Sequence, residues 1–158
     1  MKKHDLSDIL IFVLSAELVG ALSALLSGGY SGFYDKFAPP PLLPPAWLFP
    51  VVWTILYALM GFSAYLVYSS GDDPDRIKRA LTIYWVQLAV NFSWSIVYFR
   101  FEALWAGFAV ILLLIILTAA MIRSFARIRK TAGILNIPYI LWLCFAAYLN
   151  LATALINT

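Results

Sequence analysis

The strongest constraint on the fold of this chain is the absence of charge over long stretches. No Asp, Glu, Lys or Arg occurs in residues 37–71, 80–99, 103–122 or 131–158. A helix crosses the hydrocarbon core of a bilayer, about 30 Å thick, with roughly 20 apolar residues, because each residue advances it by about 1.5 Å. Charge-free stretches of this length, in a chain that is 63% hydrophobic and 12% charged, indicate membrane spans and not a water-soluble core.

The hydrophobic stretches predict an all-α integral membrane protein, a five-transmembrane-helix bundle that takes up residues 1–158 as a single domain. The expected spans lie at about 9–27, 47–69, 80–99, 103–122 and 134–156. The first span follows two lysines and could be taken for a secretory signal, but we interpret it as a retained helix. The single cysteine, Cys144, lies within the last span, so no disulfide can form inside one chain.

The positive residues are unevenly divided between the two sides of such a bundle. The side with the amino terminus and the second and fourth loops collects Lys2, Lys3, Arg76, Lys78, Arg79, Arg123, Arg127, Arg129 and Lys130. The other side holds only Lys36 and Arg100. The positive-inside rule therefore predicts a cytoplasmic amino terminus and a carboxyl terminus on the opposite side. Basic residues in short loops next to the membrane favour lipid headgroups as partners and do not indicate nucleic acid.

The connection at residues 28–46 stands out because it carries five prolines, in the segment APPPLLPP. Proline fixes φ and removes a backbone donor, so we expect a stiff, extended segment. Its apolar residues favour a lid across the mouth of the bundle over a mere link between two helices. By contrast, we expect residues 70–79, SGDDPDRIKR, to form an ordinary polar turn.

The tryptophans fall into two groups by depth. Three lie near span ends, as in the aromatic belts of many membrane proteins: Trp47, Trp85 and Trp105. Three lie deeper, at roughly 9 to 21 Å from the outer ends of their helices: Trp53, Trp94 and Trp142.

Polar residues share helix faces with the deep tryptophans. Tyr57, Asn91 and Asn150 stand at helical spacing from them. An amide in hydrocarbon needs a partner, so both asparagines should point into the bundle and bring the aromatic residues with them. This pattern predicts an aromatic-walled chamber in the outer half of the bundle. The alternative, asparagines that join helices and tryptophans that fill the core, is equally compatible with the spacing.

The residues that usually perform catalysis are scarce. The single histidine, His4, lies near the amino terminus, and no Ser/His/Asp set, metal-ligand cluster or phosphate-binding loop can be assembled. We therefore expect no metal and no cofactor. Glu17 stands in the middle of the first span, where a carboxylate is costly, and is either functional or a hydrogen-bonded structural group.

Three segments in order resemble the translocator protein family, also called tryptophan-rich sensory proteins or peripheral benzodiazepine receptors. They are PPAWLFPVVWTILYALMG at 44–61, QLAVNFSWSIVYF at 87–99 and IPYILWLCFAAYLN at 137–150. The resemblance covers about residues 34–157. It implies five transmembrane helices, frequent dimers and the binding of porphyrins, with sterols and synthetic drugs bound by some members.

The resemblance also implies a ligand-binding set. By position it comprises Tyr34, Trp53, Tyr57, Asn91, Trp94, Trp142, Ala146 and Asn150. Two departures stand out. Residues 39–42 read PPPL where the family usually has Lys-Pro-x-aromatic, which leaves the contact between lid and ligand open. The carboxyl terminus lacks the Tyr followed by Lys or Arg of the proposed sterol motif, so sterol binding is not supported.

These observations leave three functions open. The first is a membrane receptor or sensor that binds a tetrapyrrole such as protoporphyrin IX, or a similar flat hydrophobic ligand, between Trp53 and Trp142 and has no catalytic residue. The second is an enzyme that slowly degrades bound porphyrin with light or oxygen, with the same two tryptophans as redox participants. The third is a transporter, for which the sequence lacks paired repeats.

A homodimer is also expected. The resemblance implies one, and small side chains allow helices to approach closely. The small residues that form such faces are Ala16, Gly20, Ala24, Ala103 and Gly107.

Overall fold

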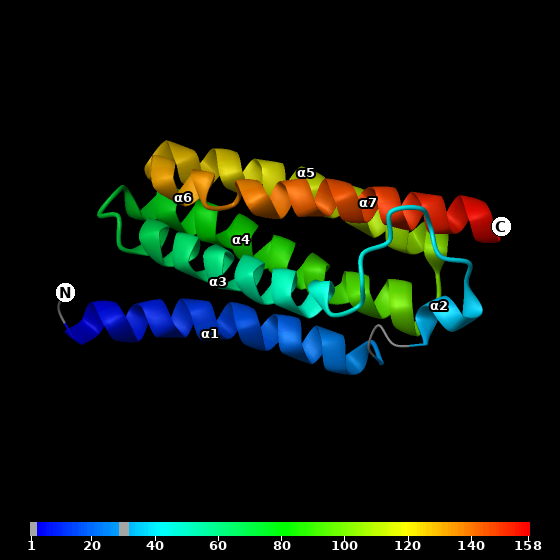
Figure 1. Ribbon diagram of the computed structural model, residues 1–158. Helices are drawn as coiled ribbons and strands as arrows, with labels where there is room; N and C mark the ends of the chain where they lie inside the picture. The colour runs from blue at the N-terminus through cyan, green and yellow to red at the C-terminus, as the bar shows by residue number, and fades with distance from the viewer. Residues whose placement is uncertain (1–2, 29–31) are drawn as a thin grey trace.

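A computed structural model describes residues 3–28 and 32–158 of the chain. The long helices are α1 (Lys3–Leu26), α3 (Leu48–Tyr68), α4 (Pro74–Ser95), α5 (Leu104–Ile128) and α7 (Ile137–Asn157). The short ones are α2 (Phe33–Lys36), a π-helical turn η1 (Ile96–Arg100) that continues α4, and α6 (Lys130–Ile134). The long helices run side by side, and α1 begins at the end of the bundle opposite to the end of α7 (Figure 1).

The described residues contain five helical segments long and apolar enough to cross a membrane. These segments are Leu6–Leu26, Leu48–Tyr68, Pro74–Arg100, Leu104–Ile128 and Lys130–Asn157. They confirm the predicted all-α, five-helix architecture. Large apolar side chains on their outer faces are exposed, with exposed fractions of 64% for Ile11 and 76% for Leu25, as expected where lipid replaces water. Lys2 and residues 29–31, which entered the predictions above, lie outside the described residues.

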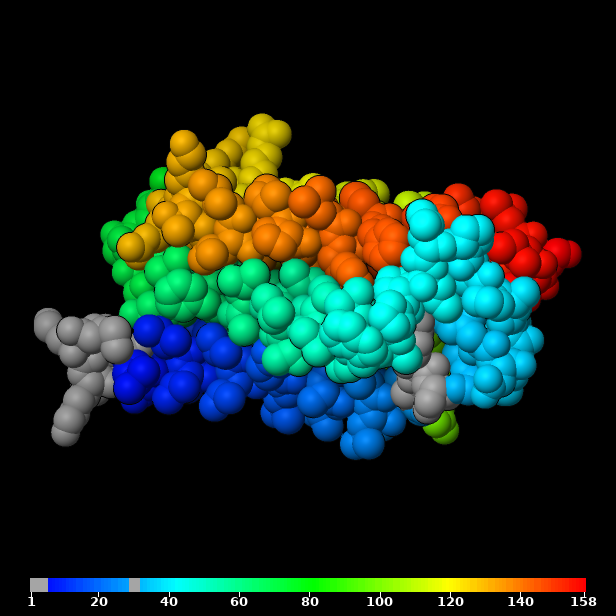
Figure 2. Space-filling model, in the orientation of Figure 1, coloured from blue at the N-terminus to red at the C-terminus, as the bar shows by residue number. Residues whose placement is uncertain are grey.

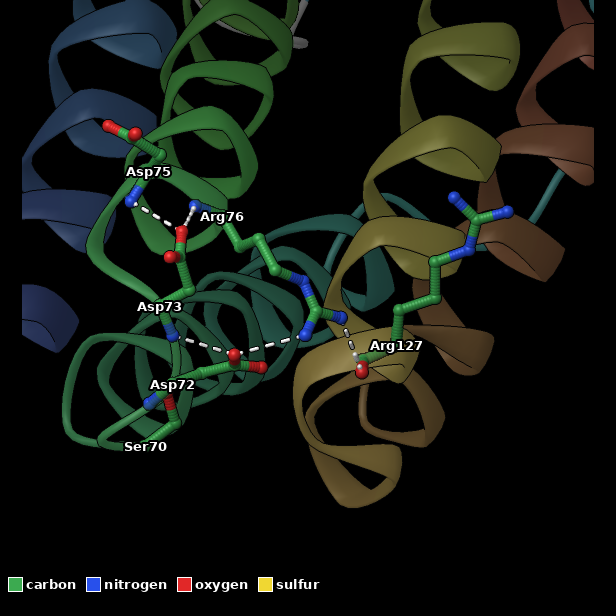
Figure 3. Close-up of polar contacts among 6 residues, drawn as sticks. All are labelled: Ser70, Asp72, Asp73, Asp75, Arg76 and Arg127. Atoms are coloured by element: carbon green, nitrogen blue, oxygen red, sulfur yellow. Dashed lines mark hydrogen bonds and ion pairs between the residues drawn. The ribbon is translucent and has the colours of Figure 1, made fainter.

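The prediction of a polar turn at residues 70–79 was wrong in its second half, because α4 already begins at Pro74. The side chain of Asp73 caps this helix and accepts hydrogen bonds of 3.0 Å from the backbone N–H groups of Asp75 and Arg76 (Figure 3). Proline suits the first turn because its missing N–H would have no helical partner there. Asp73 and Pro74 therefore form the start of a helix, and not the middle of a turn as predicted.

Arg76 joins two helices at the end of the bundle where α1 begins, called the inner end here, while the opposite end is called the outer end (Figure 1). Its guanidinium pairs with Asp72 at 3.0 Å and donates a hydrogen bond of 3.2 Å to the carbonyl oxygen of Arg127, in the last turn of α5 (Figure 3). Orphan carbonyls at a helix end are normally satisfied by water or by a cation of this kind. The contact fixes the start of α4 against the end of α5.

Small residues set the spacing between α1 and α3, which pack against each other along their length. A Cβ atom on Gly61 would lie 2.6 Å from the carbonyl oxygen of Phe12 and 2.6 Å from the Cα of Val13, so only glycine allows this approach. Toward the outer end, Gly20 lies against the ring of Tyr57.

The small-residue faces expected to support a dimer are largely used inside the protomer. Ala16 is fully buried, and Gly20 and Gly107 lie against the rings of Tyr57 and Tyr98. Close packing by small residues therefore takes place as predicted, but between helices of one chain. These positions give no argument for a contact between two copies.

The proline-rich connection lies across the outer end of the bundle and is not extended throughout, since it contains α2. Figure 2 shows the segment after α2 lying against α7 shortly before the end of that helix, which stays in view. Asn157 of α7 exchanges two hydrogen bonds with the backbone of Ala38, of 2.8 and 3.1 Å, and the Tyr148 hydroxyl donates to the carbonyl oxygen of Pro41 at 3.1 Å. Lys36 pairs with Glu102 between α4 and α5. The segment is thus attached to the bundle at several points.

Candidate ligand-binding cavity

A cavity of about 440 Å³ lies between the outer half of α1, the outer half of α3 and the junction of α4 with η1. Its wall is mainly apolar, with small residues on the α1 side and aromatic rings opposite them. The one carboxylate among the described lining residues is that of Glu17. The aromatic rings are those of Phe49, Trp53, Tyr57, Trp94 and Phe99. Cavities of about 300 to 1,000 Å³ with such walls are the usual form of small-molecule sites.

Trp53 lies at the centre of the aromatic wall. Its ring centroid is 5.5 Å from that of Tyr57, at an interplanar angle of 30°, and 6.1 Å from that of Trp94, at 34°. Trp94 in turn stacks on Tyr98 at 5.8 Å and 13°. Within α3, Trp53 and Tyr57 are one helical turn apart and therefore share a face. The three rings that face the cavity form a continuous aromatic surface.

A buried chain of hydrogen bonds runs inward from this surface. The Tyr57 hydroxyl donates to Oδ1 of Asn91 at 2.6 Å, and Nδ2 of Asn91 donates to the Tyr139 hydroxyl at 2.7 Å. The Tyr139 hydroxyl then donates to Oε1 of Gln87 at 3.0 Å. Asn91 points into the bundle, as expected of an amide in a membrane helix, and connects α3, α4 and α7. It stands behind the cavity wall.

Asn150 orients the second tryptophan of the wall. Its Oδ1 accepts a hydrogen bond of 3.1 Å from Nε1 of Trp94, and its Nδ2 donates to the carbonyl oxygen of Ala146 at 2.9 Å. All three residues are buried. The amide therefore fixes the plane of the Trp94 ring from outside the cavity.

The other two residues of the expected set lie apart from the cavity wall. Trp142 packs against Phe145 and against Phe49, a lining residue, with the ring centroids of Trp142 and Phe49 5.8 Å apart. Its buried Nε1 has no hydrogen-bond partner among the described residues. Tyr34 lies at the outer end against Phe33. Burial raises the pKa of the Tyr34 phenol, and hydrogen bonding to Thr153 opposes the rise.

The structure thus brings three of the eight expected residues onto one wall, Trp53, Tyr57 and Trp94, and adds two aromatic residues that sequence reasoning missed. Phe49 could have been found, because it lies one turn before Trp53 on the same helix face. Phe99 could not, because it lies five positions after Trp94, a spacing that does not place two residues on one face of a regular α-helix. The π-helical turn brings its ring to 5.7 Å from that of Trp94. Such turns often occur at functional sites.

Metal chemistry finds no support in this site. No group of three His, Cys, Asp or Glu side chains within residues 3–28 and 32–158 could hold a metal ion. Among the described lining residues, Glu17 is the only one with such a side chain.

The five membrane-spanning helices define a multi-pass integral membrane protein, in which α1, α3 and α4 with η1 border a tryptophan-lined cavity. The model of the TspO/MBR family matches residues 11–156, and the chain belongs to this family. It is 35% identical over 127 residues to the tryptophan-rich protein TspO of Chlorobaculum tepidum, and the matched region covers 80% of each chain. The resemblance inferred from the three sequence segments is thereby confirmed.

Two further relatives carry names that describe a role. The tryptophan-rich sensory protein of Cereibacter sphaeroides is 33% identical over 125 residues, 79% of this chain and 77% of the relative. The human translocator protein is 32% identical over 121 residues, 75% of this chain and 70% of the relative. Membership in this family supports a role as a membrane receptor or sensor.

Proposed function

We propose that this protein is a membrane receptor or sensor that binds a tetrapyrrole such as protoporphyrin IX in the cavity between α1, α3 and α4. The observation that carries this proposal is the position of Trp53, whose ring faces the cavity between those of Tyr57 and Trp94. A wide, flat ligand gains stacking energy on such a wall, which a compact aliphatic ligand does not.

The residues around the cavity then divide into two roles. Trp53, Tyr57 and Trp94 contact the ligand, while Asn91 and Asn150 hold two of these rings in place through the hydrogen bonds described above. Rigid support of this kind improves binding because the rings lose little freedom when the ligand arrives. The proline-rich connection acts as a lid that limits access from the outer end.

Titration with protoporphyrin IX, followed by the absorbance of the porphyrin itself, tests the proposal. Trp53→Phe should retain the fold and weaken binding by about 0.5 to 1.5 kcal/mol, because the larger stacking partner is lost. Trp105→Phe is the control, since Trp105 is 49% exposed and is not among the described residues that line the cavity. Equal weakening by both variants, or no effect of Trp53→Phe in a folded protein, would place the site elsewhere.

The same titration distinguishes binding from oxidative degradation. A receptor should leave the bound porphyrin unchanged in light and in the dark. An enzyme should instead cause a progressive, light-dependent loss of porphyrin. If Trp53→Phe abolishes this loss but retains binding, the protein is an enzyme.

A homodimer is the proposed assembly, on the strength of the family. Because Gly20 and Gly107 are occupied by rings of the same protomer, the contact must use another lipid-facing surface. Mass measurement in nanodiscs tests this expectation. A monomer in every lipid composition and in mild detergent would contradict it.

A further inference from the structure

Glu17 is placed in a way that packing alone does not explain. It stands in the middle of α1, within the span Leu6–Leu26, and its side chain lines the cavity. Carboxylates inside membrane spans are costly, and those that persist usually take part in binding or transport. Among the lining residues described, it is the only Asp, Glu, Lys, Arg or His.

The Glu17 carboxylate has no hydrogen-bond or ion-pair partner among the residues that the structure describes. Two donors of the wall are already used, because the Tyr57 hydroxyl donates to Asn91 and the Trp94 indole to Asn150. Among the described lining residues there is no Lys, Arg or His to compensate a charge on Glu17.

The surroundings of Glu17 are suited to a cation. Gly20, one turn further along α1, lies directly against the Tyr57 ring, so Glu17 and this ring border the same space. The faces of aromatic rings attract cations, with tryptophan the strongest, and Trp53 and Trp94 complete the wall opposite α1. A carboxylate on one side and aromatic faces on the other is a favourable environment for a protonated amine.

We propose that the cavity binds flat aromatic cations, with the protonated amine of the ligand against Glu17 and its ring system against Trp53. This inference rests on the cavity of the proposed function but does not depend on a tetrapyrrole as the ligand. It adds a selection by charge: at the α1 side the site favours a cationic or hydrogen-bond-donating group and disfavours a carboxylate. A tetrapyrrole must therefore turn its propionates away from Glu17.

Three anthracene derivatives that differ only in their polar group test the proposal. These are 9-(aminomethyl)anthracene as its ammonium ion, the neutral 9-anthracenemethanol and 9-anthracenecarboxylate, each titrated by fluorescence into protein in phosphatidylcholine nanodiscs, with empty nanodiscs subtracted. The ammonium ion should bind about tenfold more tightly than the alcohol, a difference of about 1.4 kcal/mol, and the carboxylate more weakly than the alcohol. Equal affinity for all three in the wild type overturns the proposal.

Variants of the carboxylate assign the selection to a residue. Glu17→Gln should reduce the affinity for the ammonium ion to that for the alcohol, while the unchanged affinity for the alcohol shows that the cavity is intact. Glu17→Asp, which keeps the charge, should retain the preference. Asp8→Asn removes the same charge from the same helix outside the cavity wall and should change nothing. A preference that survives Glu17→Gln, or that Asp8→Asn abolishes equally, overturns the proposal.

A parallel titration with protoporphyrin IX separates this inference from the proposed function. Porphyrin binding without any preference for the ammonium ion refutes only the role of Glu17. A preference for the ammonium ion without porphyrin binding refutes only the tetrapyrrole as ligand.

Discussion

Nε1 of Trp94 donates a hydrogen bond of 3.1 Å to Oδ1 of Asn150, across the interface between α4 and α7. Both side chains are buried, and the ring of Trp94 borders the cavity while Asn150 does not. The last helix contributes none of the described lining residues, yet it determines how one wall of the cavity is oriented.

This hydrogen bond predicts that Asn150→Leu strongly lowers the stability of the protein. The variant leaves the buried indole N–H without an acceptor, which should lower the free energy of unfolding by about 1 to 3 kcal/mol. Trp94→Phe removes the donor, so the double variant should lose less stability than the sum of the two single variants. Denaturant unfolding of all four proteins in one detergent measures the coupling. Strict additivity would contradict the role assigned to this hydrogen bond.

Gly61→Ala should separate α1 from α3. The added Cβ atom would meet the backbone of Phe12 and Val13 at 2.6 Å, and a backbone cannot move aside as a side chain can. We expect a loss of about 1 to 3 kcal/mol in stability, as for other overpacked positions, together with weaker porphyrin binding because the cavity lies between these helices. Ala106→Val, at an exposed position of α5, is the control and should leave both quantities unchanged.

Asp73→Ala should destabilise the inner end of α4. The substitution removes an acceptor that satisfies two backbone N–H groups at 3.0 Å, which typically costs about 0.5 to 2 kcal/mol. Hydrogen exchange in the first turn of α4 measures the effect locally. Asp75→Ala removes a carboxylate from the same turn but leaves the Asp73 cap intact, so it should have a smaller effect. Ligand binding at the outer end should be unchanged in both variants. Equal exchange rates in the two variants would show that the cap contributes little.

The distribution of positive residues predicts the orientation of the protein in its membrane. A tag after Thr158 should be accessible only from the side away from the cytoplasm, and a tag before Met1 only from the cytoplasm, since nine basic residues accompany the amino terminus against two on the other side. Protease protection in sealed vesicles measures both. Cleavage of both tags from one side would contradict the proposed topology.

Part of the aromatic wall could be predicted from the sequence, because helical spacing shows which residues share a face. Trp53 and Tyr57 were found in this way, and Asn91 and Asn150 were correctly expected to point inward. Spacing gives no information on what another helix places against that face. Trp142 is a deep tryptophan like Trp53, but it is not among the described lining residues and contacts one of them, Phe49.

The sequence by itself determined the five spans, because the length of an apolar stretch and the cost of charge in hydrocarbon are properties of the chain and its solvent. Only the tertiary structure decided how the spans meet. In lipid no hydrophobic force selects helix partners, so local shape does: Gly61 brings α1 against α3, and the π-helical turn rotates Phe99 toward Trp94. The position of Glu17 opposite an aromatic wall follows from that packing and from no pattern in the sequence.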